Sequence, residues 1–179
     1  TMFPFYMGIN ETKYGWMDEG WATIGEWLLT PMFMPGVVDS FGMAGYEASA
    51  GKDIDLPVMT PTTQLQGIYY EDASAFAVNS YPKPGLGYLY VKDMLGDELF
   101  FKALHNYINS WKGKHPMPYD FFNSMNEGAG INLNWFWKAW YFDNGYHDLA
   151  FATVKAGKNQ YQITVESKGS KPVPVDINV

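Results

Sequence analysis

Hydrophobic residues recur at helical spacing along most of the chain before residue 148. The clearest case is the segment 98–112, in which apolar residues three and four positions apart form one face of a helix. Gly96 and Asp97 precede it as a helix stop and an N-cap. The same spacing predicts further helices over 16–29, 41–50, 72–80, 86–94, 118–125 and 133–142.

Prolines predict where some of these helices end. We expect Pro31 to stop the helix that begins at Trp16, and we expect residues 81–85, which hold two prolines, to interrupt the chain between two helices. Residues 52–66 are rich in Pro and Thr, so we expect them to run extended over the surface.

The pattern changes at residue 148, where apolar and polar residues begin to alternate. Two alternating segments, 150–154 and 161–167, flank a turn signal at 156–159 and predict a β-hairpin, with a third extended segment over 172–179. Three strands rarely make a complete layer. The sequence therefore predicts a mainly α chain over 1–147, followed by the start of a β domain over 148–179.

Composition favours a folded chain and excludes several functions. The chain is 18% aromatic and 17% charged, which argues against disorder. Its net charge is -7 and all its basic residues are scattered lysines, which argues against nucleic-acid binding. There is no cysteine, so a metal could be held only by His, Asp or Glu. No apolar run reaches the roughly 20 residues of a membrane-spanning helix.

Two glutamates near the start of the first long predicted helix are candidates for metal chemistry. Glu19 lies in its first turn, where the helix dipole keeps a carboxylate ionised, as a metal ligand must be. Glu26 follows two turns later on the same face, from which it could hydrogen-bond a neighbouring ligand. The alternative is that both are solvated acids of the kind favoured near a helix start.

The spacing of these acids resembles that of gluzincin zinc peptidases of the aminopeptidase N and leukotriene hydrolase type. Members of this family carry a His-Glu-x-x-His helix, then eighteen residues, and then a glutamate in an Asn-Glu-Gly motif with a second glutamate seven positions on. Asp18-Glu19-Gly20 and Glu26 match the later part, with Asp18 in place of Asn. The resemblance implies that Glu19 is a zinc ligand and that Glu26 orients a neighbouring ligand.

A tyrosine further along the chain matches the family's next motif. The family has a tyrosine followed by x-Lys some sixty residues after the zinc glutamate, and Tyr81-Pro82-Lys83 stands in the matching place. The resemblance implies that Tyr81 is catalytic and donates its phenol hydrogen to the carbonyl oxygen under attack. Without the resemblance, Tyr81 would be read as a surface residue before a helix-breaking proline.

Taken over the whole chain, the resemblance implies a fragment of a longer enzyme. Residues 1–147 would be the helical C-terminal lobe of a thermolysin-like catalytic domain, beginning just after the His-Glu-x-x-His motif. Zinc would be held in the full-length protein by Glu19 and two upstream histidines, but not by this fragment, which we expect to be inactive. The partners would be a peptide substrate and the upstream half of the catalytic domain, and the exposed truncated surfaces would invite self-association.

One alternative to the peptidase remains open. A helical module that docks a peptide, a glycan or a partner through exposed aromatic residues would leave Glu19 and Tyr81 incidental. The aromatic cluster of 135–142 could be a carbohydrate platform, although its helical spacing is more typical of a core. His105, His115 and His147 lack the spacing of a zinc helix, and we expect ordinary polar or capping roles for them.

Overall fold

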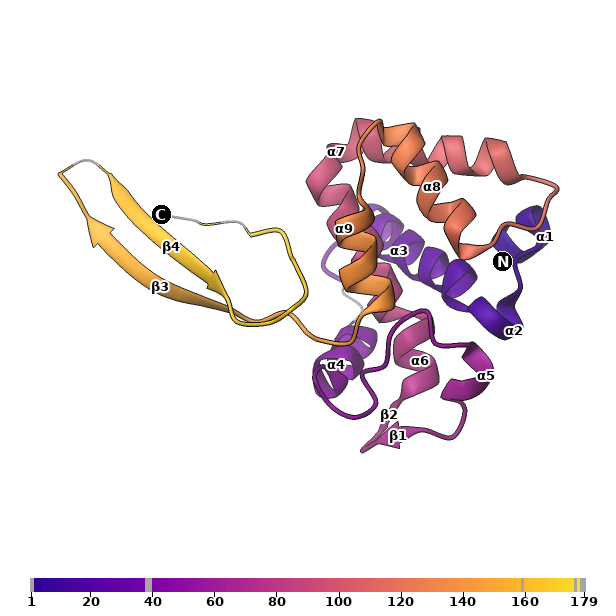
Figure 1. The fold of residues 1–179 in the computed structure, drawn as a ribbon, viewed down its shortest axis with the longest axis horizontal. Coiled ribbons are helices and arrows are strands. Elements are labelled where there is room, and N and C mark those ends of the chain that lie inside the picture. The colour runs from indigo at the N-terminus through magenta and orange to yellow at the C-terminus, as the bar shows by residue number, and fades with distance from the viewer. Residues whose placement is uncertain (1, 38–39, 159, 176, 178–179) are drawn as a thin grey trace.

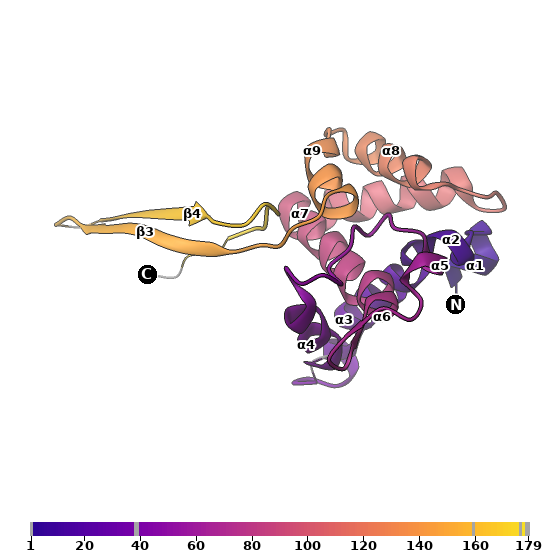
Figure 2. The same ribbon diagram turned by 60° about the horizontal axis from the view of Figure 1, so that its bottom comes forward.

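The computed structural model describes residues 2–37, 40–158, 160–175 and 177, and shows a helical body from which a β-hairpin projects (Figure 1). This confirms the mainly α fold class. The second view shows the same projection, with β3 (Leu149–Ala156) and β4 (Tyr161–Ser167) side by side (Figure 2). The helices of the body are α1 (Met2–Met7), α2 (Glu11–Tyr14), α3 (Trp16–Phe33), α4 (Ser40–Ser49), α5 (Thr62–Leu65), α6 (Ala75–Ser80), α7 (Pro82–Trp111), α8 (Pro118–Ala129) and α9 (Asn134–Trp137), with a π-helical turn η1 (Lys138–Phe142).

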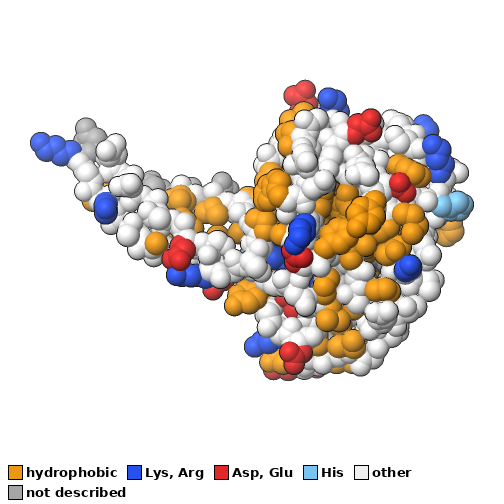
Figure 3. Space-filling view, in the orientation of Figure 1, with side chains coloured by type: hydrophobic (Ala, Val, Ile, Leu, Met, Phe, Trp, Pro, Cys, Tyr) orange, Lys and Arg blue, Asp and Glu red, His pale blue; other side chains and the backbone are white. Residues whose placement is uncertain are grey.

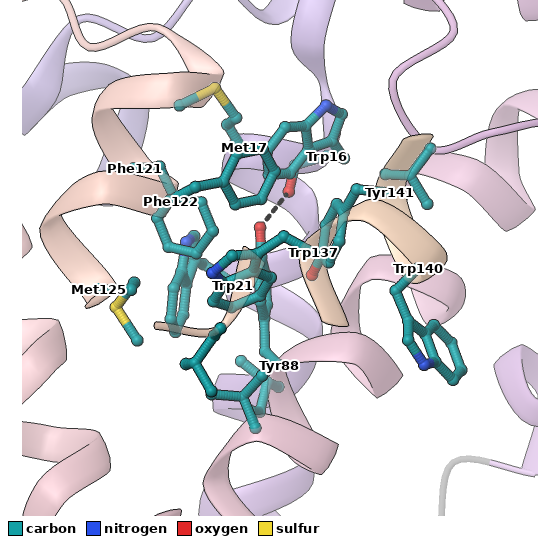
Figure 4. Close-up of a cluster of buried hydrophobic side chains, with 14 of the residues drawn as sticks. Trp16, Met17, Trp21, Tyr88, Phe121, Phe122, Met125, Trp137, Trp140 and Tyr141 are labelled. Atoms are coloured by element: carbon teal, nitrogen blue, oxygen red, sulfur yellow. Dashed lines mark hydrogen bonds between the residues drawn. The ribbon is translucent and has the colours of Figure 1, made fainter. Parts of the chain in front are cut away.

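The core of the body is built from aromatic side chains of α3, α7, α8, α9 and η1 (Figure 4). Trp21 of α3 stacks on Tyr88 of α7 with ring centroids 4.2 Å apart, and both rings meet the edge of Phe121 from α8. The Tyr88 hydroxyl donates a hydrogen bond to the carbonyl oxygen of Trp16, 3.2 Å away. These contacts fix α3, which carries Glu19 and Glu26, against α7, whose first residue follows Tyr81.

The tryptophans between 135 and 142 divide between core and surface. Trp137 and Trp140 are almost fully buried in the same core, whereas Trp135 is 54% exposed. The structure therefore supports a core role for most of this cluster, as its helical spacing indicates.

Two expectations about prolines are wrong. Helix α3 continues past Pro31 to Phe33, because a proline removes one backbone hydrogen bond without forbidding the helical φ of its own position. The interruption expected over 81–85 is confined to Tyr81 (φ -110°, ψ -86°), since Pro82 starts α7 at the first helical position, where a missing N–H costs nothing. The break expected at Gly96 is confirmed, with a φ of 71° that divides α7 by a kink.

The segment 52–66 does not lie extended on the surface. Ile54 and Val58 are buried, and Ile54 packs with Leu65 of α5 and with Ala75 in a small second core. Proline and threonine content indicated a loop correctly, but the apolar residues between them turn that loop inward against α6 and α7.

The predicted hairpin is confirmed and leaves one apolar face open. Phe151 pairs with Val165, Val154 with Ile163 and Ala156 with Tyr161, with an irregularity between Phe151 and Thr153. Phe151, Val154 and Tyr161 are each more than half exposed. Hydrophobic side chains are visible both on the hairpin and on the body (Figure 3).

The third strand expected over 172–179 is absent from its described part, 172–175 and 177. The chain instead returns to the body at Lys171, which is buried and donates to the carbonyl oxygens of Ala139 (2.7 Å) and Asp143 (3.1 Å). Trp140 donates its indole N–H to the carbonyl oxygen of Pro172 at 2.6 Å. These bonds satisfy groups at the end of η1, which a paired strand would leave unmet. In the part of the chain that the structure describes, no helix is both long enough and apolar enough to cross a membrane.

Candidate functional site

The first turn of α3 places Glu19 at the edge of the core. Gly15 joins α2 to α3 in a helical conformation, and its N–H donates to the Thr62 hydroxyl at 2.9 Å. Trp16 and Met17 then enter the core, and Glu19 follows on a partly buried face. The helix start is therefore anchored on both sides, which fixes the direction of the Glu19 side chain.

A close crossing of α3 and α7 brings Tyr81 to Glu19. The absence of a side chain at Gly20 allows this approach, since a Cβ there would lie 3.0 Å from the Cβ of Pro84 and 3.0 Å from the Tyr88 ring. The carbonyl oxygen of Pro84 also accepts a hydrogen bond from the Tyr141 hydroxyl at 3.1 Å. The residue after Glu19 thus sets the distance between the two helices at the level of the candidate site.

We expect Gly20→Ala to lower the free energy of unfolding by about 1–3 kcal/mol, because the added methyl group overpacks this crossing. Gly25→Ala is the matched control in the same helix, since a Cβ at Gly25 meets no atom within 4 Å. It should leave stability unchanged or raise it slightly, because alanine favours a helix more than glycine does. Urea denaturation measures both, and equal stabilities for the two variants would contradict this account of the crossing.

The Tyr81 hydroxyl lies beside the Glu19 carboxylate, close enough for each group to shift the pKa of the other. Burial, together with the neighbouring Glu19 carboxylate, raises the pKa of Tyr81 to about 12. Burial also raises the pKa of Glu19, and the neighbouring Tyr81 hydroxyl opposes that shift. At neutral pH the phenol therefore keeps its hydrogen and remains a donor.

Glu26 shares a cavity with Tyr81. The cavity has a volume of about 560 Å³ and lies between α3, α4, α6 and the β-turn that joins β1 (Tyr69–Tyr70) to β2 (Ala73–Ser74). Glu26 is exposed on its wall, one turn beyond Thr23, which also lines it. The structure thus places the Tyr81 hydroxyl beside Glu19, and places Tyr81 and Glu26 on the wall of a common cavity.

A complete metal site is not formed by the described residues alone. Within the described ranges, no three His, Asp or Glu side chains converge as a metal ion would require. Glu19 fits one position of a zinc site, because zinc takes carboxylate ligands and this carboxylate is held in a fixed, partly buried place. Further ligands would have to come from outside these residues.

The three histidines each have their own surroundings. His105 is exposed on α7, and Nδ1 of His115 lies 2.9 Å from the carbonyl oxygen of Gly8. His147 stacks on Trp140, and burial lowers its pKa. The surroundings of His105 and His115 agree with the ordinary polar roles expected for them, whereas His147 packs against an aromatic ring and its buried Nδ1 has no hydrogen-bond partner among the described residues.

Sequence reasoning missed a buried ion pair beside Tyr81. Lys83 is fully buried and its ammonium group lies 2.5 Å from the Asp55 carboxylate. The sequence did offer one signal for Lys83, because this lysine stands two residues after Tyr81 within the tyrosine motif. It offered no signal for Asp55, which stands in a segment expected to be a surface loop and lies far along the chain from Lys83.

Comparison with known proteins shows the family to which the chain belongs. The model of the peptidase family M1 domain matches residues 11–140, most of the chain, and the matched range holds Glu19, Glu26, Tyr81 and the whole cavity. A comparison with curated proteins finds no match. Because the family match covers well over half of the sequence, the chain belongs to peptidase family M1.

Proposed function

We propose that this chain is part of a zinc-dependent, aminopeptidase-like metallopeptidase that hydrolyses peptide bonds. The closeness of the Tyr81 hydroxyl to the Glu19 carboxylate carries the proposal, because it brings together the two residues that the family motifs assign to zinc binding and to catalysis. The membership of family M1 supports a peptidase. We call the longer polypeptide that would carry this chain and the upstream histidines the full-length protein.

Glu19 would be one protein ligand of zinc and the two upstream histidines the others, leaving a position open for water. The anchored start of α3 fixes the place of Glu19 in the fold before any metal binds, and the neighbouring Tyr81 hydroxyl favours the charged form of its carboxylate. When bound, zinc would polarise the carbonyl group of the scissile peptide bond and lower the pKa of a water molecule. Glu26, on the wall of the same cavity, would orient a neighbouring ligand by a hydrogen bond.

Tyr81 would stabilise the negative charge that develops on the attacked carbonyl oxygen. Its phenol is protonated at neutral pH, and it faces a cavity large enough for side chains of a peptide. When the Glu19 carboxylate binds zinc, the Tyr81 hydroxyl would be free to donate to the substrate oxygen. Such a donor stabilises the transition state more than the ground state, which raises kcat.

We also propose that residues 1–147 are the helical lobe of the catalytic domain and that 148–179 begin a β domain. The open apolar face of the hairpin supports this division, because an isolated two-stranded hairpin is marginally stable and gains stability when further strands or a helix cover that face. The same face would promote self-association while it stays uncovered.

The proposal is tested by metal removal from the full-length protein. We expect hydrolysis of a fluorogenic peptide to stop in the presence of 1,10-phenanthroline and to return when zinc is restored. A binding module would hydrolyse nothing. Hydrolysis by the untreated protein therefore already distinguishes a peptidase from a binding module. Hydrolysis that continues at full rate in excess chelator would show that the reaction does not use a metal.

The 179-residue chain alone should bind zinc only weakly and show no peptidase activity, because one carboxylate cannot hold the ion against water. Isothermal titration of the chain with zinc chloride measures this. Micromolar binding that Glu19→Ala abolishes would contradict the expectation and place further ligands within this chain.

A further inference from the structure

The ion pair between Lys83 and Asp55 is enclosed by protein on all sides. The lysine side chain is fully buried and the Asp55 side chain is only 2% exposed. The ammonium group also donates to the carbonyl oxygen of Leu56 at 2.5 Å, and the second oxygen of Asp55 accepts from the N–H of Gly51 at 2.8 Å. Each charged group therefore has two partners, and the geometry of the pair is fully determined.

This arrangement is a poor device for stability alone. Burial lowers the pKa of Lys83, a shift that the Asp55 charge opposes, so the ammonium group has been removed from water at a cost. Lys83 also lies in the first turn of α7, where the helix dipole disfavours a positive charge. Apolar residues of similar volume commonly replace such pairs without loss of stability. The role of the ion pair therefore lies in the part of the chain that it holds in place.

What it holds is the junction between α6 and α7. Lys83 lies two residues after Tyr81 and binds the loop at Asp55 and Leu56. Asn79 lies two residues before Tyr81, and its amide donates to the carbonyl oxygens of Leu56 (3.2 Å) and Pro57 (2.9 Å). The chain on both sides of Tyr81 is thus tied to one short loop, 55–57.

Tyr81 is the single non-helical residue between α6 and α7, and no side chain caps the start of α7 there. Its N–H donates to the carbonyl oxygen of Ala77 at 3.0 Å and its carbonyl oxygen accepts from the N–H of Gly85 at 3.1 Å, so its backbone is tied to both helices. A shift of either helix end at this junction therefore moves the Cα–Cβ bond of Tyr81, and with it the place of the hydroxyl beside Glu19 and the cavity.

We propose that the Lys83–Asp55 ion pair is a positioning device for the Tyr81 hydroxyl, acting through the α6–α7 junction. This inference rests on the proposed catalytic function of Tyr81. Lys83 and Asp55 touch neither substrate nor metal, and their effect on the reaction passes entirely through the place of the phenol. Loss of the pair should then reduce kcat and leave substrate binding nearly unchanged.

The test is the double variant Lys83→Met/Asp55→Asn in the full-length protein. Both charges disappear together, volumes are kept, the Asn79 bond to Leu56 remains, and the new amide oxygen can still accept from Gly51. Lys92→Met/Asp97→Asn is the matched control, because it makes the same two substitutions at a 2.6 Å pair of α7 whose aspartate is 75% exposed. We expect kcat to fall about tenfold in the first variant with KM within about twofold, and to stay unchanged in the control.

The same variants in a Tyr81→Phe background separate positioning from general damage. If the pair acts through Tyr81, its removal costs nothing further once the hydroxyl is gone. Two results would overturn this inference and leave the proposed function standing. One is that the double variant loses kcat equally in both backgrounds. The other is that the double variant loses no kcat although Tyr81→Phe itself lowers kcat. If Tyr81→Phe itself has no effect, the catalytic role proposed for Tyr81 is wrong and this inference falls with it, whereas the zinc-dependent peptidase function is tested separately by metal removal.

A second variant serves if the double variant does not fold, as circular dichroism will show. Asp55→Glu keeps both charges but lengthens the anchor by one methylene group, so it should also lower kcat and not KM.

Discussion

Tyr81→Phe in the full-length protein is expected to lower kcat about 10²- to 10³-fold with little change in KM. The substitution removes one hydroxyl and keeps the ring, so the α6–α7 junction and the cavity wall remain. What disappears is the donor that is protonated at neutral pH and held beside Glu19. Steady-state hydrolysis of a fluorogenic peptide gives both constants.

Tyr119→Phe is the control for this prediction, since Tyr119 is 64% exposed on α8 and is not among the residues that line the cavity. Its activity should match that of the unaltered protein. A kcat for Tyr81→Phe within about twofold of the unaltered value would show that the phenol does not stabilise the transition state.

Glu19→Gln is expected to remove zinc from the full-length protein and peptidase activity with it. The amide keeps the shape of the carboxylate, but it lacks the charge that a zinc ligand supplies. Atomic emission spectrometry should find about one zinc ion per molecule in the unaltered protein and almost none in the variant.

Two neighbouring glutamates provide the controls for the loss of zinc. Glu11→Gln, on the exposed surface of α2, should leave the zinc content unchanged. Glu26→Gln should weaken zinc affinity by about 10- to 100-fold, since Glu26 is proposed to orient a ligand and not to bind the metal. A Glu19→Gln protein that retains zinc and full activity would exclude the assignment of Glu19.

The helices and the hairpin were predictable because their signals are local. The apolar spacing of 98–112 and the alternation after 148 depend only on residues near each other in the chain, and both elements form as expected. Errors arose where distant contacts decide the outcome. The loop 52–66 turns inward because its apolar residues meet α6 and α7, and residues 172–175 follow hydrogen bonds to η1 in place of a strand.

The candidate site was predictable in its members and not in its support. Glu19, Glu26 and Tyr81 follow from motif spacing, and the structure places Tyr81 beside Glu19 and on the wall of the cavity that Glu26 also lines. The Lys83–Asp55 pair was not foreseeable, because the partner of a buried lysine is set by how α7 packs on a loop from elsewhere in the chain. Motif spacing in the sequence indicates candidate residues for binding or reaction. The residues that hold these candidates in place can be identified only from the packing of the folded chain.

The central claim is that the carboxylate of Glu19 binds zinc within reach of the Tyr81 hydroxyl. A crystal structure of the full-length protein, with an anomalous difference map at the zinc absorption edge, tests it most directly. We predict one strong peak about 2.0–2.2 Å from a carboxylate oxygen of Glu19, with the Tyr81 hydroxyl facing the same space. A zinc peak away from Glu19, or a Glu19 side chain turned into solvent away from Tyr81, would contradict the account.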